Sequence, residues 1–286
     1  MTEETWPVPV EDPLATAGPP WLEGKVAVVA GGGQSGALPN VGFAMAWLYA
    51  RSGAAVAILD RDRSAGQRTV DAIEGDGGTA ASFDVDITDD ASVADAIEQV
   101  MGRFGRIDVA ATSIGGGGAM SIFDATPEQF DATMDLNCKS AWLLMRHVAP
   151  HMPRGGSIVT VSSGAAEGRG PALPYSIAKT ALEKLSVGAA ASLAPQGIRV
   201  NCVRVGMIWG AFASRGMDEE MRELRRQNVA LQTEGNPWDI ASAAFFLSTD
   251  QARWVSGQVL AVDGGGFAFR GNSGAAGPKT VRNAKG

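Results

Sequence analysis

Short runs rich in valine, isoleucine and alanine alternate along this chain with amphipathic stretches of helical length. Repetition of this pattern predicts successive βαβ units, because a parallel sheet is covered on both faces by its connecting helices. We therefore predict an α/β fold, a Rossmann-type doubly wound parallel sheet in a single domain. The expected strands are residues 26–30, 55–59, 80–84, 109–113, 157–161, 199–203 and 259–262, and the expected helices are residues 41–52, 64–76, 90–104, 127–151, 174–194 and 237–248.

The two ends of the chain differ in composition from this alternating region. Residues 1–23 are rich in proline and predict an extended arm, which Trp6 and Trp21 would hold against a surface. The tail at 267–286 is rich in Gly, Ala, Asn and Lys and has no periodicity. Residues 24–266 are therefore the expected domain, within which the charged stretch near 211–236 predicts a mobile lid.

The charge and apolar patterns exclude two classes of partner. The net charge is -7, and no cluster of Lys and Arg forms the basic surface of a nucleic-acid-binding protein. No apolar run approaches the ~18 residues of a membrane span, and the acidic first residues do not resemble a targeting signal. Cys138 and Cys202 fall in a predicted helix and strand, as expected of buried thiols in a reducing compartment, so we expect a cytoplasmic protein.

A glycine-rich turn follows the first predicted strand. Gly31 begins it, and Asn40, Val41 and Gly42 lead into an apolar helix, whose N-terminal amides would face a pyrophosphate. Asp60 ends the second strand eighteen residues beyond Gly42, where a carboxylate can bind both hydroxyls of an adenosine ribose.

The carboxylate at position 60 also bears on which dinucleotide would bind. A 2′-phosphate next to Asp60 would meet a like charge, so the sequence favours NAD over NADP. Arg61 is the opposing observation, because a guanidinium can accept that phosphate. A helix-capping Asp followed by a solvated Arg is the alternative explanation of this pair.

A tyrosine and a lysine four residues apart suggest acid–base chemistry. On a helix Tyr175 and Lys179 lie on the same side, and a neighbouring cation favours the phenolate, which would lower the pKa of the tyrosine. The hydroxyl of Ser163 could hold a carbonyl or alcohol oxygen against that phenol. A surface lysine next to a half-buried ring is the common structural explanation of the same spacing.

At several separated places the chain resembles the short-chain dehydrogenase/reductase family, over residues 24–265. The residues that carry the resemblance are Asp86-Ile87-Thr88-Asp89, Asn137, Ser163, Tyr175, Lys179, Ile198-Arg199-Val200-Asn201, Gly235-Asn236-Pro237-Trp238-Asp239-Ile240-Ala241, Ser256-Gly257-Gln258 and Val262-Asp263-Gly264-Gly265. Their order along the chain matches that of the family.

The resemblance implies a role for each matching residue. Tyr175 would be the acid or base on the substrate oxygen, and Lys179 would bind the nicotinamide ribose and lower the pKa of the tyrosine. Ser163 would position the substrate oxygen, and Asn137 would order a water that relays protons to the lysine. Asp86 and Ile87 would lie at the adenine. The family also implies a homotetramer, or a homodimer, built on helices 127–151 and 174–194.

The chain departs from the family pattern in the turns that touch the cofactor. Counting back from Gly42 leaves five extra residues after Gly31, so the loop is longer than usual. The family's motifs after the fourth and sixth strands are replaced, and Gly210 stands where a Thr often contacts the carboxamide. Backbone contacts are therefore expected at four positions, Ser113, Ile114, Gly115 and Ile208. Ser162 competes with Ser163 for the catalytic position.

The chain has two histidines, His147 and His151, spaced like zinc ligands. No Glu or Cys completes a metal set nearby, so we expect no metal site.

The function expected from these residues is an NAD-dependent oxidoreductase that interconverts a secondary alcohol and a ketone, with a compact apolar, cyclic or aromatic substrate. Expected pocket walls are Ile114, Gly115, Ala165, Ala166, Leu173, Val205, Met207, Trp209 and Phe212, whereas inward-turned Glu167, Arg169 or Arg215 would admit a carboxylate or sugar. The alternatives are an NADPH-dependent 3-ketoacyl reductase and a non-catalytic NAD-binding sensor or scaffold.

Overall fold

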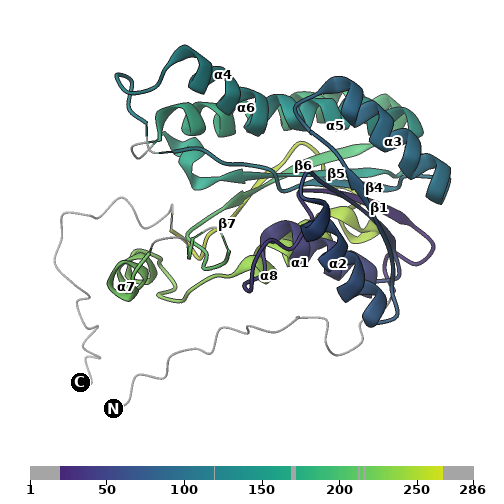
Figure 1. Ribbon diagram of the computed structural model, residues 1–286, viewed down its shortest axis with the longest axis horizontal. Helices are drawn as coiled ribbons and strands as arrows, with labels where there is room; N and C mark the ends of the chain where they lie inside the picture. The colour runs from purple at the N-terminus through teal and green to yellow at the C-terminus, as the bar shows by residue number, and fades with distance from the viewer. Residues whose placement is uncertain (1–19, 119, 169–171, 212, 215–216, 267–286) are drawn as a thin grey trace, which may run out of the picture.

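A seven-stranded parallel sheet runs through the molecule with helices on both faces (Figure 1). The computed structural model describes residues 20–118, 120–168, 172–211, 213–214 and 217–266. The strands are β1 (Val26–Ala30), β2 (Ala55–Asp60), β3 (Thr79–Asp84), β4 (Val109–Thr112), β5 (Ser157–Ser163), β6 (Arg199–Val205) and β7 (Val259–Val262). Their order, β3-β2-β1-β4-β5-β6-β7, reverses between β1 and β4, which confirms the predicted doubly wound Rossmann-type fold.

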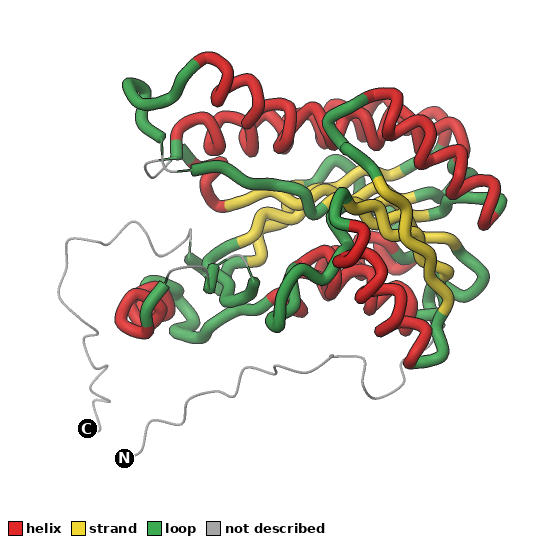
Figure 2. Tube along the Cα trace, in the orientation of Figure 1, coloured by secondary structure: helices red, strands yellow, loops and turns green. Residues whose placement is uncertain are grey.

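The helices form one layer on each side of this sheet, as Figure 2 shows. One layer contains α1 (Val41–Arg51), α2 (Arg63–Gly75) and α8 (Pro237–Ser248). The other contains α3 (Asp90–Phe104), α4 (Pro127–Met134), η1 (Asp135–Lys139), α5 (Ser140–Val148) and α6 (Leu173–Leu193). Helix α7 (Glu219–Gln227) lies beyond the ends of the strands, and short 3-10 turns are Ala149–His151, Gly164–Glu167, Ala194–Gln196 and Asp250–Ala252.

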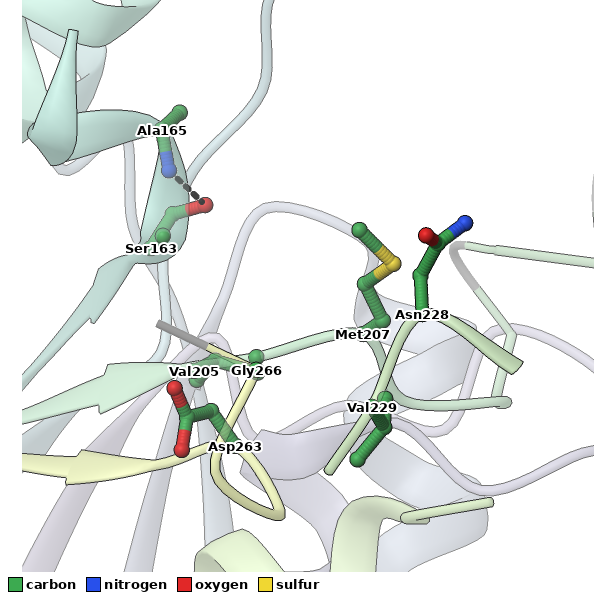
Figure 3. A pocket seen from close by; sticks show the side chains of 10 residues that line it. Ser163, Ala165, Val205, Met207, Asn228, Val229, Asp263 and Gly266 are labelled. Atoms are coloured by element: carbon green, nitrogen blue, oxygen red, sulfur yellow. Dashed lines mark hydrogen bonds between the residues drawn. The ribbon is translucent and has the colours of Figure 1, made fainter. Parts of the chain in front are cut away.

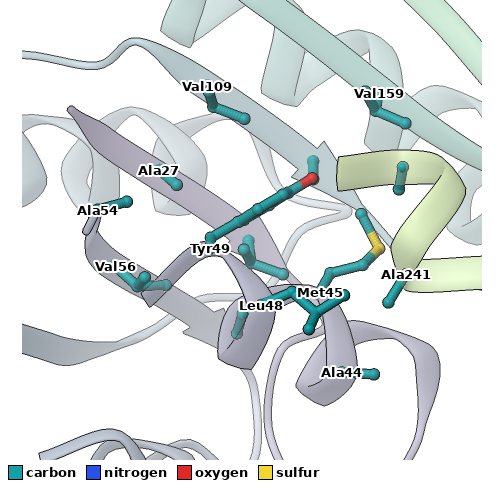
Figure 4. Close-up of a cluster of buried hydrophobic side chains, with 14 of the residues drawn as sticks. Ala27, Ala44, Met45, Leu48, Tyr49, Ala54, Val56, Val109, Val159 and Ala241 are labelled. Atoms are coloured by element: carbon teal, nitrogen blue, oxygen red, sulfur yellow. The ribbon is translucent and has the colours of Figure 1, made fainter. Parts of the chain in front are cut away.

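Each strand alternates its side chains between two apolar clusters, one under each helical layer. In β1, Ala27 and Val29 pack towards α1 and α8, whereas Val28 and Ala30 pack towards α3 and α5. Figure 4 shows the first cluster, with Tyr49 at its centre. The Tyr49 hydroxyl lies 2.9 Å from Ser248 Oγ, so the one polar atom of this buried ring joins α1 to α8.

The expected single helix 127–151 is interrupted in the structure. Helix α4 passes through the π-helical turn η1 into α5, and Ser140 N donates to Asp135 O across that turn. A π-helical turn adds a residue to the helix repeat, and such turns are common at functional sites. This one lies at Asn137.

The predicted lid contains a helix that the sequence analysis did not predict. Asp218 caps α7 by accepting from Met221 N, and Arg222 and Arg226 pair with Glu234 and Glu223. Ion pairs thus replace the missing apolar anchors.

Predictions for the arm and tail at 1–19 and 267–286 lie outside the described residues, although the end of the arm is anchored through buried Leu22, whose N donates to Ser52 O at 2.8 Å.

Candidate active site

A large cavity of about 1250 Å³ opens at the carboxyl ends of the parallel strands. This edge of an open α/β sheet, at the reversal of strand order, is where ligands bind in such folds. Most of the predicted site residues line it, namely Gly31, Asn40, Val41, Asp60, Arg61, Asp86, Ile87, Ser113, Ile114, Gly115, Ser163, Tyr175, Lys179 and Ile208.

Gly42 and Asn137, which were also predicted for the site, do not line this cavity. Gly42 is buried in α1, and a Cβ there would lie 1.9 Å from Gly31 O. The structure therefore gives Gly42 a packing role, because only glycine lets the helix approach the turn so closely. Asn137 lies just behind the cavity wall and acts on it indirectly.

Side chains of the loop itself hold the extended turn in shape. Gln34 Nε2 donates to Gly36 O at 2.7 Å and to Leu38 O at 2.9 Å. Asn40 Nδ2 donates to Gly33 O at 2.7 Å, while its Oδ1 accepts from Phe43 N at 2.8 Å and so caps α1. The extra residues therefore form an ordered part of the cavity rim.

Two carboxylates and a guanidinium lie at the β2 and β3 end of the cavity. Asp60 accepts from Gly33 N at 2.9 Å and from Asp62 N at 3.0 Å, one bond to each oxygen. Asp86 accepts from the hydroxyl and the amide of Thr88, which lower the pKa of the carboxyl, with a smaller contribution from the charge of Arg61. The anionic state of Asp86 is thus stabilised locally.

The predicted Tyr175 and Lys179 meet at the β5 end of the cavity, and their electrostatics differ from the expectation. Lys179 is buried, its Nζ donates to Ile114 O and Val161 O at 3.0 Å each, and burial lowers its pKa to about 8. Its Nζ lies 5.8 Å from the centre of the Tyr175 ring. The pKa of Tyr175 is raised by burial and is offset only in part by a hydrogen bond with Ser163. The expectation that the lysine lowers the pKa of Tyr175 was wrong, because desolvation of the phenol dominates.

The structure separates the two adjacent serines. The Ser162 hydroxyl is buried and donates to Glu183 Oε1 at 2.9 Å, away from the phenol. Ser163 hydrogen-bonds with Tyr175, and its Oγ accepts from Ala165 N at 3.2 Å. Ser163 is therefore the serine whose hydroxyl shares a space with the phenol.

Asn137 fixes the backbone that faces the lysine. Its Nδ2 donates to Thr133 O at 2.9 Å and to Gly116 O at 2.7 Å, and its Oδ1 accepts from Gly116 N at 3.1 Å. The side chain thus satisfies a helix carbonyl at the π-helical turn and holds the loop segment that follows β4. At Gly115 a Cβ would lie 2.8 Å from Lys179 Nζ, so the segment needs glycine to pass this close.

A smaller cavity of about 200 Å³ lies next to Ser163 (Figure 3). Its walls are mainly aliphatic, with Asn228 and Asp263 as polar members. The predicted wall residues Ala165, Val205 and Met207 line it, whereas Phe212, Arg169 and Arg215 lie outside the described residues. Glu167 is not a free charge, because it pairs with Arg204.

Several residues that line the large cavity were not predicted from the sequence, including Gly116, Gly117, Met217, Arg225 and Pro237. At Gly117 a Cβ would lie 3.1 Å from Tyr175 Cβ, so the glycine run at 115–118 was a readable signal of close approach. Arg225 stands three residues after Arg222 on α7, a helical spacing that became meaningful only once the helix was known.

One of the two histidines contacts a carboxylate on a neighbouring helix. His147 Nε2 lies 2.8 Å from Asp90 Oδ1 and joins α5 to α3. Within the described part of the chain, no three His, Cys, Asp or Glu side chains gather as a metal site would require. None of the described helices is long and apolar enough to cross a membrane.

Comparison with known proteins gives the family. A family model described as enoyl-(acyl carrier protein) reductase matches residues 36–266. The 7alpha-hydroxysteroid dehydrogenase of Escherichia coli K12 is 33% identical over 248 residues, 86% of this chain and 95% of that protein. Dehydrogenase/reductase SDR family member 4 of Homo sapiens is 33% identical over 253 residues, 85% of this chain and 88% of that protein.

Solved structures agree with these matches. A structure of 7alpha-hydroxysteroid dehydrogenase complexed with NADH and 7-oxo glycochenodeoxycholic acid superposes with a TM-score of 0.80 at 33% identity, and the match covers 86% of this chain and 95% of that one. A dehydrogenase/reductase from Sinorhizobium meliloti 1021 gives a TM-score of 0.79 at 31% identity, over 86% of this chain and 96% of that one. The chain therefore belongs to the short-chain dehydrogenase/reductase family, as its motifs predicted, and is an NAD(P)-dependent oxidoreductase of the alcohol dehydrogenase and ketone reductase type.

Proposed function

We propose that this oxidoreductase uses NAD to interconvert a compact, largely apolar secondary alcohol and its ketone. The observation that carries the proposal is the placement of Asp60 and the Ser163–Tyr175–Lys179 group in one cavity, at its two ends. The carboxylate of Asp60 suits the ribose of an adenosine, and the Ser163–Tyr175–Lys179 group suits a substrate oxygen that gains or loses a proton.

The residues present fit a nicotinamide dinucleotide. Each Asp60 oxygen accepts one backbone hydrogen bond and keeps acceptor capacity for a ribose hydroxyl. A 2′-phosphate at the same place would meet the charge of that carboxylate. When bound, the nicotinamide supplies hydride transfer, and the protein orients the substrate and exchanges a proton with its oxygen.

Acid–base chemistry is assigned to the group around the phenol. Tyr175 would exchange a proton with the substrate oxygen, and Ser163 would hold that oxygen by a hydrogen bond. Lys179 would bind the nicotinamide ribose, and its cation would favour the phenolate of Tyr175. Asn137 would act as a positioning residue through the 113–117 backbone.

The walls of the small cavity support an apolar substrate. Ala165, Val205, Met207 and Val229 present aliphatic surface next to Ser163. An apolar pocket with few polar anchors holds a hydrophobic ligand in one orientation. The name of the related hydroxysteroid dehydrogenase, a protein whose substrate is a cyclic secondary alcohol, agrees with a cyclic substrate here.

A second candidate is an NADPH-dependent 3-ketoacyl reductase. Arg61 lines the cavity next to Asp60 and supports a 2′-phosphate there. The assembled Ser163, Tyr175 and Lys179 argue against the other expected alternative, a non-catalytic NAD-binding sensor or scaffold.

We also propose a cytoplasmic homotetramer, or a homodimer. Helix α6 exposes Ile177 and Val187, each 40% accessible, and α5 exposes Trp142. Apolar side chains exposed on these two helices suit the subunit interface that the family resemblance implies. Buried Cys202 and half-buried Cys138, both free thiols, fit a reducing compartment.

Cofactor choice and substrate class are tested together. Secondary alcohols, sugars, hydroxy acids and 3-hydroxyacyl thioesters are screened with NAD and with NADP by the absorbance of reduced cofactor. We expect cyclic alcohols and NAD to be preferred. A preference for acyl thioesters with NADP would instead support the 3-ketoacyl reductase.

Removing the carboxylate should narrow or reverse the preference for NAD. In Asp60→Ala the repulsion of a 2′-phosphate is lost, but so is the anchor of Gly33. Asp60→Asn is the matched variant, because its amide oxygen can still accept one of the backbone bonds. Both variants should gain NADP affinity relative to NAD by about tenfold or more. Tighter binding of NADP than NAD by the wild type would show that Arg61 reads the ribose.

A further inference from the structure

The lid side of the large cavity carries an arginine to which the family motifs assign no role. Arg225 stands on α7, half-buried in the cavity wall. Its Nη2 donates to Ile208 O at 3.2 Å, and among the described residues this is its only hydrogen bond. The neighbouring Glu234 is held by the guanidinium fork of Arg222. Arg225 thus lacks a direct carboxylate partner within the described residues, and burial lowers its pKa.

The N-terminus of α1 forms another wall of the same cavity. Val41, its first residue, lines the cavity, and the eleven-residue helix presents its positive end there. The lid begins next to this end, because Ala211 N donates to Pro39 O at 3.3 Å. An anion that α1 attracts would therefore lie in a space that the lid also borders.

Among the described residues, the other cations that line this cavity already interact with other groups. Arg61 lies with Asp60 and Asp86 at the β2 and β3 end, where its charge acts on Asp86. The ammonium of Lys179 is held by two carbonyl oxygens at the opposite end. Gly210 also lines the cavity but has no side chain, and a Cβ there would lie 2.8 Å from Pro237 Cγ.

We propose that Arg225 binds the diphosphate of the dinucleotide from the lid side, across the cavity from the α1 N-terminus. The inference rests on the proposed use of NAD. A guanidinium offers two parallel donors to phosphate oxygens, and one weak bond to Ile208 O is readily exchanged for them. Binding of the diphosphate would then hold α7 over the cavity and free the Ile208 carbonyl.

The test compares Arg225→Gln with Arg226→Gln by calorimetric titration of NADH, ADP-ribose and adenosine. Arg226 is the matched control, because it is on the same turn of α7 but pairs with Glu223. Arg225→Gln should weaken the binding of NADH and of ADP-ribose by about tenfold to a hundredfold, which is the effect of losing a charge-assisted hydrogen bond. The affinity for adenosine, which has no phosphate, should stay unchanged. The affinity of Arg225→Lys for ADP-ribose should lie between those of wild type and Arg225→Gln.

Thermal melting without ligand checks that each variant is folded. Unchanged ADP-ribose affinity in Arg225→Gln, with wild type binding NADH, would overturn this inference and leave the proposed function intact. An equal loss for adenosine would also overturn it, because the arginine would then shape the lid rather than contact phosphate. Failure of wild type to bind NADH would overturn the proposed function as well.

Discussion

At the scale of single residues, burial decides the electrostatics of the site. Lys179 is only 2% exposed, and its ammonium donates to the carbonyls of Ile114 and Val161. Carbonyl dipoles compensate less of the desolvation cost than a carboxylate would. The protein therefore keeps a cation whose desolvation is only partly compensated, next to the ring of Tyr175.

The pH dependence of stability should reveal this cation. The folded pKa of Lys179, about 8, lies below its ordinary 10.5, so the unfolded chain binds more protons between these values. The contribution of this group to the free energy of unfolding should therefore rise with pH across this window, by on the order of 3 kcal/mol. Lys179→Met should lack the rise. The free energy of unfolding of both proteins is measured by urea denaturation from pH 8 to 10.5. The same pH dependence in wild type and Lys179→Met would contradict this prediction.

Residues with a fixed chain spacing could be predicted from the sequence, and residues placed by tertiary contacts could not. Tyr175, Lys179 and Asp60 reach the cavity because a helix repeat and a strand end fix them. Arg225 depends on α7, which forms in a stretch without apolar periodicity and is held by ion pairs. The direction of the Tyr175 pKa depended on burial, which sequence spacing does not give.

At the scale of elements, the loop between β1 and α1 is built around Asn40. This residue both caps α1 and ties the helix to Gly33 O. Five extra residues were evident from counting glycines, but the side-chain bonds that order them were not. The need for glycine at position 42 is likewise evident only from the structure, where a Cβ would clash with Gly31 O.

Two substitutions at Asn40 separate its roles. Asn40→Ala removes the cap and should lower the free energy of unfolding by about 1 kcal/mol. Asn40→Asp keeps the cap acceptor but loses the Nδ2 donor to Gly33 O, so it should retain the stabilisation from the cap and lose that of the loop contact. The added charge would face the diphosphate, so Asn40→Asp should weaken NADH binding by about tenfold. Equal NADH affinity in Asn40→Asp and wild type, by calorimetry, would show that α1 does not face the diphosphate.

The interruption of helix 127–151 shows why element boundaries were harder to predict than element type. The apolar pattern continues from α4 into α5, so nothing in it marks a π-helical turn. The turn forms at Asn137, whose amide bonds Thr133 O within the helix and Gly116 O across the site. A tertiary contact thus decides a local helix geometry.

At the scale of the whole molecule, one polar network joins the strands and helices beneath the site. Glu183 on α6 accepts from Ser162 on β5 and from Arg204 on β6, and Arg204 also pairs with Glu167 in the segment after β5. Side-chain exposure is 10% for Glu183 and 20% for Arg204. The network holds the segment after Ser163 against the sheet.

Breaking one partner of this network should cost more than replacing the pair. Arg204→Met leaves Glu183 buried without its cation, and the free energy of unfolding should fall by about 3 kcal/mol. Combining it with Glu183→Leu should restore part of that loss, because no buried charge is then left without a partner, and the Glu167 carboxylate is 39% exposed to water. Urea denaturation of both variants and of wild type measures the difference. A double variant less stable than Arg204→Met would refute this account.

The central claim is that the phenol of Tyr175 performs the proton transfer while the rest of the cavity binds the dinucleotide. The deciding measurement is turnover of Tyr175→Phe with the best substrate of the screen, alongside its NADH dissociation constant. Tyr49→Phe is the matched control, because Tyr49 is the chain's other tyrosine and lies in the core, bonded to Ser248.

We predict that Tyr175→Phe loses about 10²- to 10⁴-fold in turnover while its NADH affinity stays within about twofold of wild type, and that Tyr49→Phe keeps its turnover. Tyr175→Phe with turnover near that of wild type would contradict the account.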